Sequence, residues 1–173
     1  MAVGGRATMR HGRAFAGLAA AIGLLVFAAP AAARDLPPGG MTATELASWL
    51  IGNGYPAQVK PDPTTPGDQI ISTRTDGIAV DIYLYDCSGD GDARRCTSMQ
   101  YAAGWAANAS HTMERVNSWN NTKRYIKAYL TASGSLYGEY DLDVSPGGTY
   151  EMLNDELQNW RSVVVDFNKY FNG

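Results

Sequence analysis

The sequence predicts an α+β fold, an antiparallel sheet of about five strands with helices packed on it. Two observations lead to this prediction. Segments of alternating apolar and polar residues, typical of half-buried strands, follow one another with short turns between them. Segments with an apolar residue every three or four positions, typical of helices, lie before, between and after those strands. The predicted order is one helix, three strands, one helix, two strands and one helix.

The first helix of this order is predicted to begin at Thr42. Thr42 and Glu45 have the spacing of a capping box, in which each side chain accepts a hydrogen bond from the other residue's backbone N–H. Leu46, Trp49 and Leu50 follow at the spacing of one apolar helix face. Residues 57–60 could form a brief strand, and Pro61, Pro63 and Pro66 then interrupt regular structure until Asp68.

A β-hairpin over residues 78–101 is the centre of the predicted sheet. A strand rich in β-branched residues over 69–75 leads into it through a tight Asp76-Gly77 turn. In the first arm, apolar residues alternate with those of a solvent-facing side: Ala79, Asp81, Tyr83 and Tyr85. Serine, glycine and aspartate over 88–92 predict the turn between the two arms.

Cys87 and Cys96 lie on opposite arms of this hairpin, on either side of its turn. A disulfide between them would close a loop of about ten residues and stabilise the fold by roughly 2.5–3 kcal/mol. The alternative is two reduced thiols that face each other across the strands. An even cysteine count in an exported protein favours the disulfide.

The second half of the chain predicts a helix, a strand pair and a long helix. Ser110 or Thr112 can cap the helix to about Asn121, and residues 124–131 and 136–144 alternate around a Ser133-Gly134 turn. In the last helix, over 149–171, apolar residues recur in steps of three and four: Leu153, Leu157, Trp160, Val164, Phe167 and Phe171. This stripe is expected to pack across the sheet and can leave part of its length for a partner.

The beginning of the chain has the pattern of a secretory signal peptide. Three arginines precede an apolar run over 15–27, and the small residues Ala31-Ala32-Ala33 follow it. We expect cleavage after Ala33, with Ala31 as the second choice, and a periplasmic or secreted product. An uncleaved membrane anchor is the alternative, but the run is short for a span of about 20 residues. The predicted segments are a signal peptide (1–33), a flexible linker (34–41) and one α+β domain (42–173).

Charge argues against two classes of partner. The net charge is −3, and the leader holds three of the 14 basic residues but none of the 17 acidic ones, so the mature chain carries −6. Nucleic-acid binders need a basic face, so we expect no nucleic-acid partner. After cleavage we also expect no contact with an anionic membrane.

Several stretches resemble the YbjN-like domain family of bacterial proteins over about residues 41–171. The resemblance rests on these segments: Thr42 to Leu50, Ile82 to Cys87, Met99 to Trp105, Val116 to Asn120 with Lys123-Arg124-Tyr125, Pro146 to Thr149, and Trp160. The family is similar in fold to the small dimeric chaperones of type III secretion and is labelled a sensory transduction regulator. The resemblance implies a non-catalytic, chaperone-like protein-interaction module without a cofactor, which binds a protein or peptide and can form a homodimer. The leader and cysteine pair depart from the cytoplasmic members, so cytoplasmic chaperone duties are not implied.

One polar and aromatic cluster is the candidate binding patch. Its residues are Trp105, Trp119, Asn120 and Arg124, with Asn117 beside them. Exposed tryptophan and arginine are common anchors of interfaces. The alternative is structural, with the asparagines bonded to backbone and Arg124 paired with an acid such as Asp141.

Chemical sites have weaker support in the sequence. Residues 86–92 have the alternating oxygens of half a calcium loop, but its twelfth position is Thr97 instead of glutamate. His111, the one histidine after the leader, is expected at the surface, so we expect no metal site. An envelope hydrolase that uses the carboxylates of Asp81, Asp86 and Glu139 is the alternative function. Retaining glycosidases would need two such groups about 5–5.5 Å apart in a cleft.

Overall fold

The computed structural model describes residues 1–5 and 33–173, so most of the predicted signal peptide lies outside the described residues. The elements are α1 (Ala43–Gly52), β1 (Ala57–Pro61), β2 (Gln69–Thr75), β3 (Ile78–Ser88), a 3-10 turn η1 (Gly91–Ala93), β4 (Arg95–Trp105), α2 (Met113–Thr122), β5 (Lys127–Leu130), β6 (Leu136–Asp143) and α3 (Tyr150–Asn172). The sheet is antiparallel, with strand order β1-β2-β3-β4-β6-β5. The predicted α+β fold is confirmed.

The sheet has one strand more than the five expected. The additional strand, β1, pairs with β2 from Ala57 opposite Thr73 to Pro61 opposite Gln69. It is the outermost strand on its side of the sheet. A strand that ends in proline is tolerated there, because proline has no N–H to donate to a neighbour.

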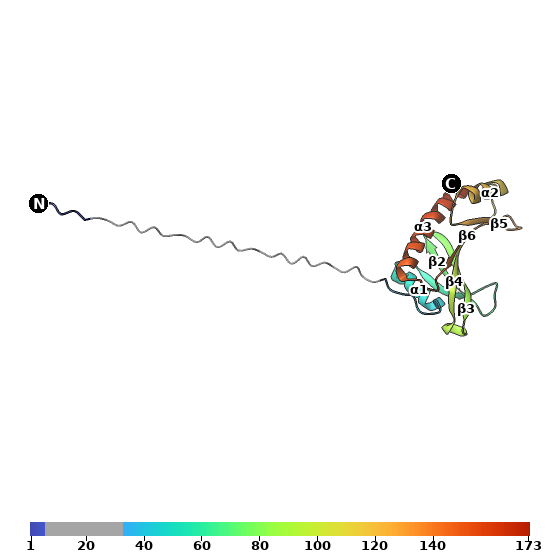
Figure 1. Ribbon diagram of the computed structural model, residues 1–173. Helices are drawn as coiled ribbons and strands as arrows, with labels where there is room; N and C mark the ends of the chain where they lie inside the picture. The colour runs from blue at the N-terminus through green and yellow to red at the C-terminus, as the bar shows by residue number, and fades with distance from the viewer. Residues whose placement is uncertain (6–32) are drawn as a thin grey trace. The chain divides into compact units, whose positions relative to one another are not determined.

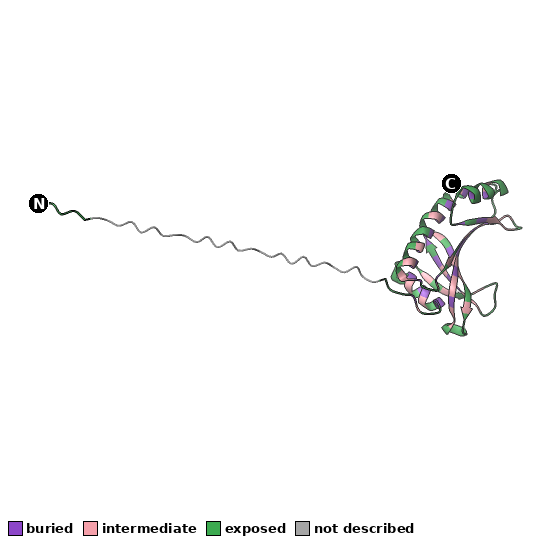
Figure 2. Cartoon of the chain, viewed as in Figure 1, coloured by how far each residue is buried: buried purple, intermediate pink, exposed green. Residues whose placement is uncertain are grey.

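The helices place the hydrophobic core on one face of the sheet. Figure 1 shows α1 and α3 along that face, with α2 beside β5. The whole apolar stripe of α3 is buried, as the purple segments of Figure 2 indicate. Trp160 stacks on Tyr101 of β4 with ring centroids 5.5 Å apart. The expectation that part of this stripe remains for a partner is therefore corrected, because the sheet and α2 cover it.

Capping residues define the helix starts as predicted. Thr42 Oγ1 accepts a hydrogen bond from the Glu45 N–H at 3.1 Å, and Glu45 Oε2 accepts one from the Thr42 N–H at 3.0 Å. Thr112 and Thr149 cap α2 and α3 without the reciprocal bond, as their side chains accept from the N–H of Arg115 and of Met152. Of the helices in the described part of the chain, none is both long and apolar enough to cross a membrane.

Residues 34–41, expected to be a flexible linker, instead lie against the domain as an N-terminal strap. The Leu36 N–H donates to Gly148 O at 2.9 Å, and Met41 and Cys96 exchange two backbone hydrogen bonds of 3.0 and 2.9 Å. At the start of the strap, the Arg34 N–H donates to Glu151 Oε2 at 2.9 Å. Leu36 and Met41 are buried, and burial of these two apolar side chains favours the attached state.

Candidate functional site

The face of the sheet opposite the core has no helix on it within residues 33–173 (Figure 1). We call it the open face. Its side chains are those that alternate away from the core along the strands. They are Gln58 and Lys60 on β1, Ile70, Ser72 and Arg74 on β2, Ala79, Asp81, Tyr83 and Tyr85 on β3, Ser98, Gln100, Ala102 and Gly104 on β4, Tyr137, Glu139, Asp141 and Asp143 on β6, and Lys127 and Tyr129 on β5.

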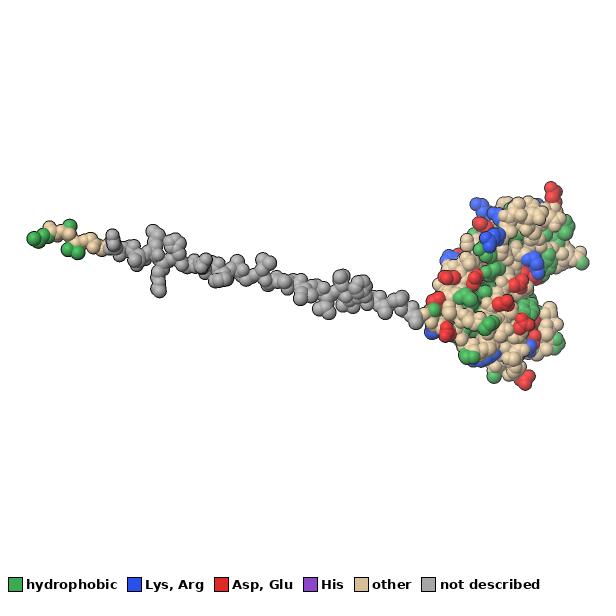
Figure 3. All heavy atoms as spheres, viewed as in Figure 1, with side chains coloured by type: hydrophobic (Ala, Val, Ile, Leu, Met, Phe, Trp, Pro, Cys, Tyr) green, Lys and Arg blue, Asp and Glu red, His purple; other side chains and the backbone are tan. Residues whose placement is uncertain are grey.

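Small residues at the centre of the open face leave a hollow of about 280 Å³. Ala79, Ala102 and Gly104 are among its lining residues, beside Asp81, Tyr83 and Tyr137. A Cβ atom on Gly104 would lie 2.8 Å from Tyr137 Cε1, so glycine lets this ring lie close to the strand. Figure 3 shows acidic side chains gathered around an indentation on the side of the molecule away from α3.

Tyr83 of β3 and Tyr137 of β6 line this hollow, and Tyr129 of β5 lies next to Tyr137. Tyr129 and Tyr137 are cross-strand neighbours whose rings stack, with centroids 5.5 Å apart and planes 13° apart. Burial, followed by the charge of Asp81, raises the pKa of Tyr83. Burial also raises the pKa of Tyr129, whose hydroxyl donates to Glu139 Oε1 at 2.7 Å. The phenols of Tyr83 and Tyr129 therefore stay neutral at ordinary pH.

Three acids of the central strands, Asp81, Asp141 and Glu139, bind polar side chains of adjacent strands. Asp81 Oδ1 accepts from the Ser72 hydroxyl at 2.6 Å, and Asp141 Oδ1 accepts from the Gln100 amide at 2.7 Å. Lys127 Nζ lies 2.7 Å from Glu139 Oε2. The register aligns Ser72, Asp81, Ala102, Glu139 and Lys127 in one row across the sheet.

The carboxylates of the alternative hydrolase do not share one cleft in the described structure. Of Asp81, Asp86 and Glu139, only Asp81 lines the central hollow. Ala102 separates Asp81 from Glu139 in the cross-strand row. Asp86 is exposed five residues further along β3, with a positive φ of 52°. The geometry therefore gives no specific support to a two-carboxylate reaction.

The structure does not assemble the predicted binding patch on the surface. Trp119 is completely buried, and its Nε1–H donates to Ile126 O at 3.0 Å. It contacts Phe167 edge to face at 4.9 Å, and Trp105 packs on the same phenylalanine at 5.2 Å. This corrects the expectation for Trp119, whose ring belongs to the core. Trp105 is half-buried, and it also lines the hollow of the open face.

Asn120 and Arg124 also differ from the binding-patch interpretation. The Asn120 side chain accepts from the Ala128 N–H at 2.9 Å and donates to Ala128 O at 3.0 Å, which is the structural alternative. Arg124 is exposed, and its guanidinium lies 5.1 Å from the Tyr125 ring centroid. The alternative pairing of Arg124 with Asp141 is not present among the ion pairs of the described residues.

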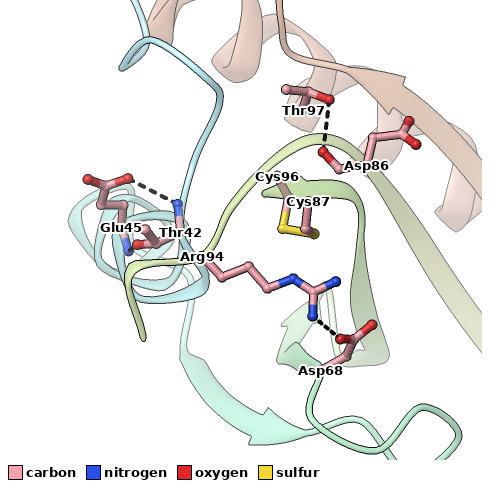
Figure 4. Close-up of a disulfide and its surroundings, with 8 residues drawn as sticks. All are labelled: Thr42, Glu45, Asp68, Asp86, Cys87, Arg94, Cys96 and Thr97. Carbon is pink, nitrogen blue, oxygen red and sulfur yellow. Dashed lines mark hydrogen bonds and ion pairs between the residues drawn. A yellow bond between two sulfur atoms is a disulfide. The ribbon is translucent and has the colours of Figure 1, made fainter. Parts of the chain in front are cut away.

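Cys87 and Cys96 face each other across β3 and β4 and form a disulfide (Figure 4). They line a small hollow of about 70 Å³ together with Asp68 and Arg94, which form an ion pair beside the sulfurs. The neighbouring turn, over which half a calcium loop was considered, contains η1. No group of three or more His, Cys, Asp or Glu side chains in the described ranges could hold a metal ion.

His111 is buried, which corrects the expectation of a surface residue. Its exposed fraction is 7%. Its Nε2 lies 2.9 Å from Asn172 Oδ1, and its ring meets Phe171 edge-on at 6.2 Å. The turn before α2 and the end of α3 enclose the imidazole, so its role in this structure is to join these two segments.

Comparison with known proteins supports the family indicated by the fold. A family model described as "YbjN: Putative bacterial sensory transduction regulator" matches residues 42–172. The chain belongs to the YbjN family. The YbjN family description is that of a regulator and names no reaction.

A solved structure shares this YbjN fold. The crystal structure of YbjN from E. coli, described as "a putative transcription regulator", has a TM-score of 0.51 and 17% sequence identity. The match covers 70% of this chain and 84% of that chain. At this identity the likeness concerns the fold alone. No curated protein matches the chain.

Sequence reasoning missed the open face of this YbjN domain as a site. The signal was present, because Tyr83, Tyr129 and Tyr137 each fall at solvent-facing positions of an alternating strand. The three tyrosines meet only through the pairing of β4 with β6, which joins strands far apart in the sequence. β6 itself lies between β4 and β5, so its acids are not on an edge of the sheet.

Proposed function

We propose that this YbjN domain is a non-catalytic regulatory module that binds a protein or peptide partner on its open face. The observation that supports this function is the hollowed, tyrosine-rich sheet face without a covering helix in the described residues. Tyrosine is enriched in protein interfaces because its ring contributes apolar area while its hydroxyl still forms hydrogen bonds. The family description of a regulator agrees with such a role.

The proposal includes export and a chaperone-like mode of action. The arginine-rich, apolar and small-residue order of the leader supports a periplasmic or secreted location. The Cys87–Cys96 disulfide is a bond that persists in oxidising compartments. In such a compartment the module would hold its partner by contact, without a cofactor or a chemical step.

Site-specific photo-crosslinking tests the proposed interaction. A benzoylphenylalanine replaces Tyr83 on the open face in one variant and the exposed Ser162 on α3 in a matched control. After irradiation in the native cells, we expect a discrete adduct from position 83, identified by mass spectrometry, and none of that identity from position 162. Identical adducts from both positions, or none from position 83, would contradict the proposal.

Two measurements test the location and the oligomeric state. Fractionation and N-terminal sequencing are expected to find the protein outside the cytoplasm with Arg34 as its first residue. Light scattering tests the homodimer, which would need a surface other than the buried stripe of α3. A cytoplasmic product that retains its leader would remove export from the proposal and leave the open face unaffected.

A further inference from the structure

We propose that the open face recognises a segment of the partner protein that carries lysine or arginine side chains. This inference rests on the proposed function and specifies the chemistry of the partner. A cationic side chain would enter the hollow beside Asp81 and the rings of Tyr83 and Tyr137, and the other carboxylates of the face would attract the rest of the segment.

The charge of the central strands is the first argument. β3, β4 and β6 place four carboxylates on the open face, those of Asp81, Glu139, Asp141 and Asp143, and no basic side chain. The only basic residue in these three strands is Arg95, which pairs with Glu45 of α1 at 2.8 Å. The basic side chains of the face lie on the strands that flank these three. Lys127 of β5 is paired with Glu139, Arg74 of β2 donates to Gly77 O at 2.9 Å, and Lys60 lies on the edge strand β1. A cationic segment therefore complements the face, and an anionic one would be repelled.

Unused acceptor atoms are the second argument. Asp81 and Asp141 use Oδ1 for their hydrogen bonds to Ser72 and Gln100. Their Oδ2 atoms accept no hydrogen bond from any residue that the structure describes. Ammonium and guanidinium groups carry several N–H donors, so such atoms are suitable partners for them.

The tyrosine rings are the third argument. A cation within about 6 Å of an aromatic ring centroid is attracted by the negative face of the ring. The open face already contains one such contact, with Lys127 Nζ 5.7 Å from the Tyr129 centroid. Tyr83 and Tyr137 line the hollow beside Asp81, so a cation there would meet a ring and a carboxylate together.

A segment of protein fits these features better than a neutral sugar or a folded helix. A neutral sugar carries no charge that the carboxylates would attract. The rings of Tyr129 and Tyr137 stack on each other, so each has one ring face fewer for a sugar. The hollow of about 280 Å³ is of side-chain size, whereas a helix is about 10 Å across. An extended segment would direct alternate side chains into it.

Isothermal titration with a synthetic probe tests this inference. The probe is a blocked decapeptide of alternating lysine and threonine, compared with a peptide that has glutamate for lysine, with spermine and with a neutral oligosaccharide. The protein variants are Asp81→Asn with Asp141→Asn, and the matched control Asp155→Asn with Asp166→Asn, both exposed on α3. Asparagine keeps the shape and an acceptor oxygen but removes the charge.

We expect the lysine peptide to bind the wild-type domain and the control equally and the open-face variant about tenfold more weakly. Salt is expected to weaken binding to the wild type. Equal unfolding midpoints of the two variants would show that both are folded. Equal peptide affinities of the two variants, or tighter binding of spermine, the oligosaccharide or the glutamate peptide, would overturn the inference.

Failure of this inference is distinguishable from failure of the proposed function. If no lysine peptide binds but the crosslink from position 83 still forms, the open face is an interaction surface and the cationic partner is refuted. If neither the peptide nor the crosslink is observed, both proposals fail.

Discussion

The side-chain amide of Asn120 bonds to both the N–H and the carbonyl oxygen of Ala128. A neighbouring strand would bond to the same two backbone groups. β5 is the last strand of the sheet, so its outer backbone groups would otherwise face solvent or another chain. At residue scale, one side chain from α2 therefore covers the middle of an exposed strand edge.

Replacement of Asn120 by alanine is expected to destabilise the domain by about 1–3 kcal/mol, because two backbone hydrogen bonds are lost at a partly buried position. Urea unfolding measures the change. Asn121→Ala is the matched control, since Asn121 is exposed on the same helix. Equal stability of the two variants would contradict this role of Asn120.

The ion pair between Glu45 and Arg95 is expected to stabilise the domain in a pH-dependent way. A side-chain hydrogen bond from Arg95 is the main cause that lowers the pKa of Glu45 below its ordinary value of 4.5. A lowered folded-state pKa adds stability above the unfolded pKa, and this contribution disappears as the pH falls through the folded value. Glu45→Gln keeps the cap and loses the ion pair, so we expect it to be about 0.5–1 kcal/mol less stable at neutral pH.

Thermal unfolding across the acid range checks this expectation. The difference between the wild type and Glu45→Gln is expected to shrink as the pH falls from neutrality to below about 4. A difference that stays constant over that range would show that the charge of Glu45 does not contribute.

At the scale of elements, the hairpin of β3 and β4 joins both halves of the sheet. β3 pairs with β2, and β4 pairs with β6, which comes from a later part of the chain. The disulfide closes the end of the hairpin, where the strap also pairs with Cys96 through Met41. The bond therefore lies where three segments of the chain meet.

Removal of this bond by Cys87→Ala with Cys96→Ala is expected to cost roughly 2.5–3 kcal/mol, since it frees a loop of about ten residues in the unfolded chain. Urea unfolding with and without reductant measures the effect. Reductant should lower the stability of the wild type toward that of the variant and leave the variant unchanged. If complete reduction leaves the stability of the wild type unchanged, the disulfide does not stabilise the domain as expected.

The spacing of apolar residues and the positions of capping residues were sufficient to predict most helices and strands. The capping box at Thr42 and the apolar stripe of α3 appear in the structure at the predicted residues. β1 was considered only as a possible brief strand over 57–60 and was left out of the predicted order, because the prolines after it gave no sign of its pairing with β2. Trp119 was predicted to lie at the surface because its sequence neighbours are polar. Its burial depends on Phe167 and Phe171 of α3. Such long-range contacts leave no local pattern.

At the scale of the whole molecule, the helices and the strap enclose one face of the sheet and leave the other for contacts. The strap joins the start of α3 to the hairpin through Leu36 and Met41. The open face could not be derived from the sequence, since its row from Ser72 to Lys127 depends on the order in which four strands pair.

A chain that begins at Met41 is expected to be less stable than one that begins at Arg34 by about 1.5–3 kcal/mol, the value of burying one leucine side chain. It would lose the burial of Leu36 and its hydrogen bond to Gly148. Calorimetry of both chains measures the difference. Leu36→Asp in the longer chain should reproduce the loss, and Pro38→Ala should not. Equal melting temperatures of the two chains would show that the strap adds no stability.

The contact between the Arg34 N–H and Glu151 has a consequence for maturation. In the uncut chain this nitrogen belongs to a neutral amide. After the proposed cleavage behind Ala33 it would be the terminal ammonium group, and the same short contact would become an ion pair. The proposed cleavage would thus also bind the new N-terminus to the last helix.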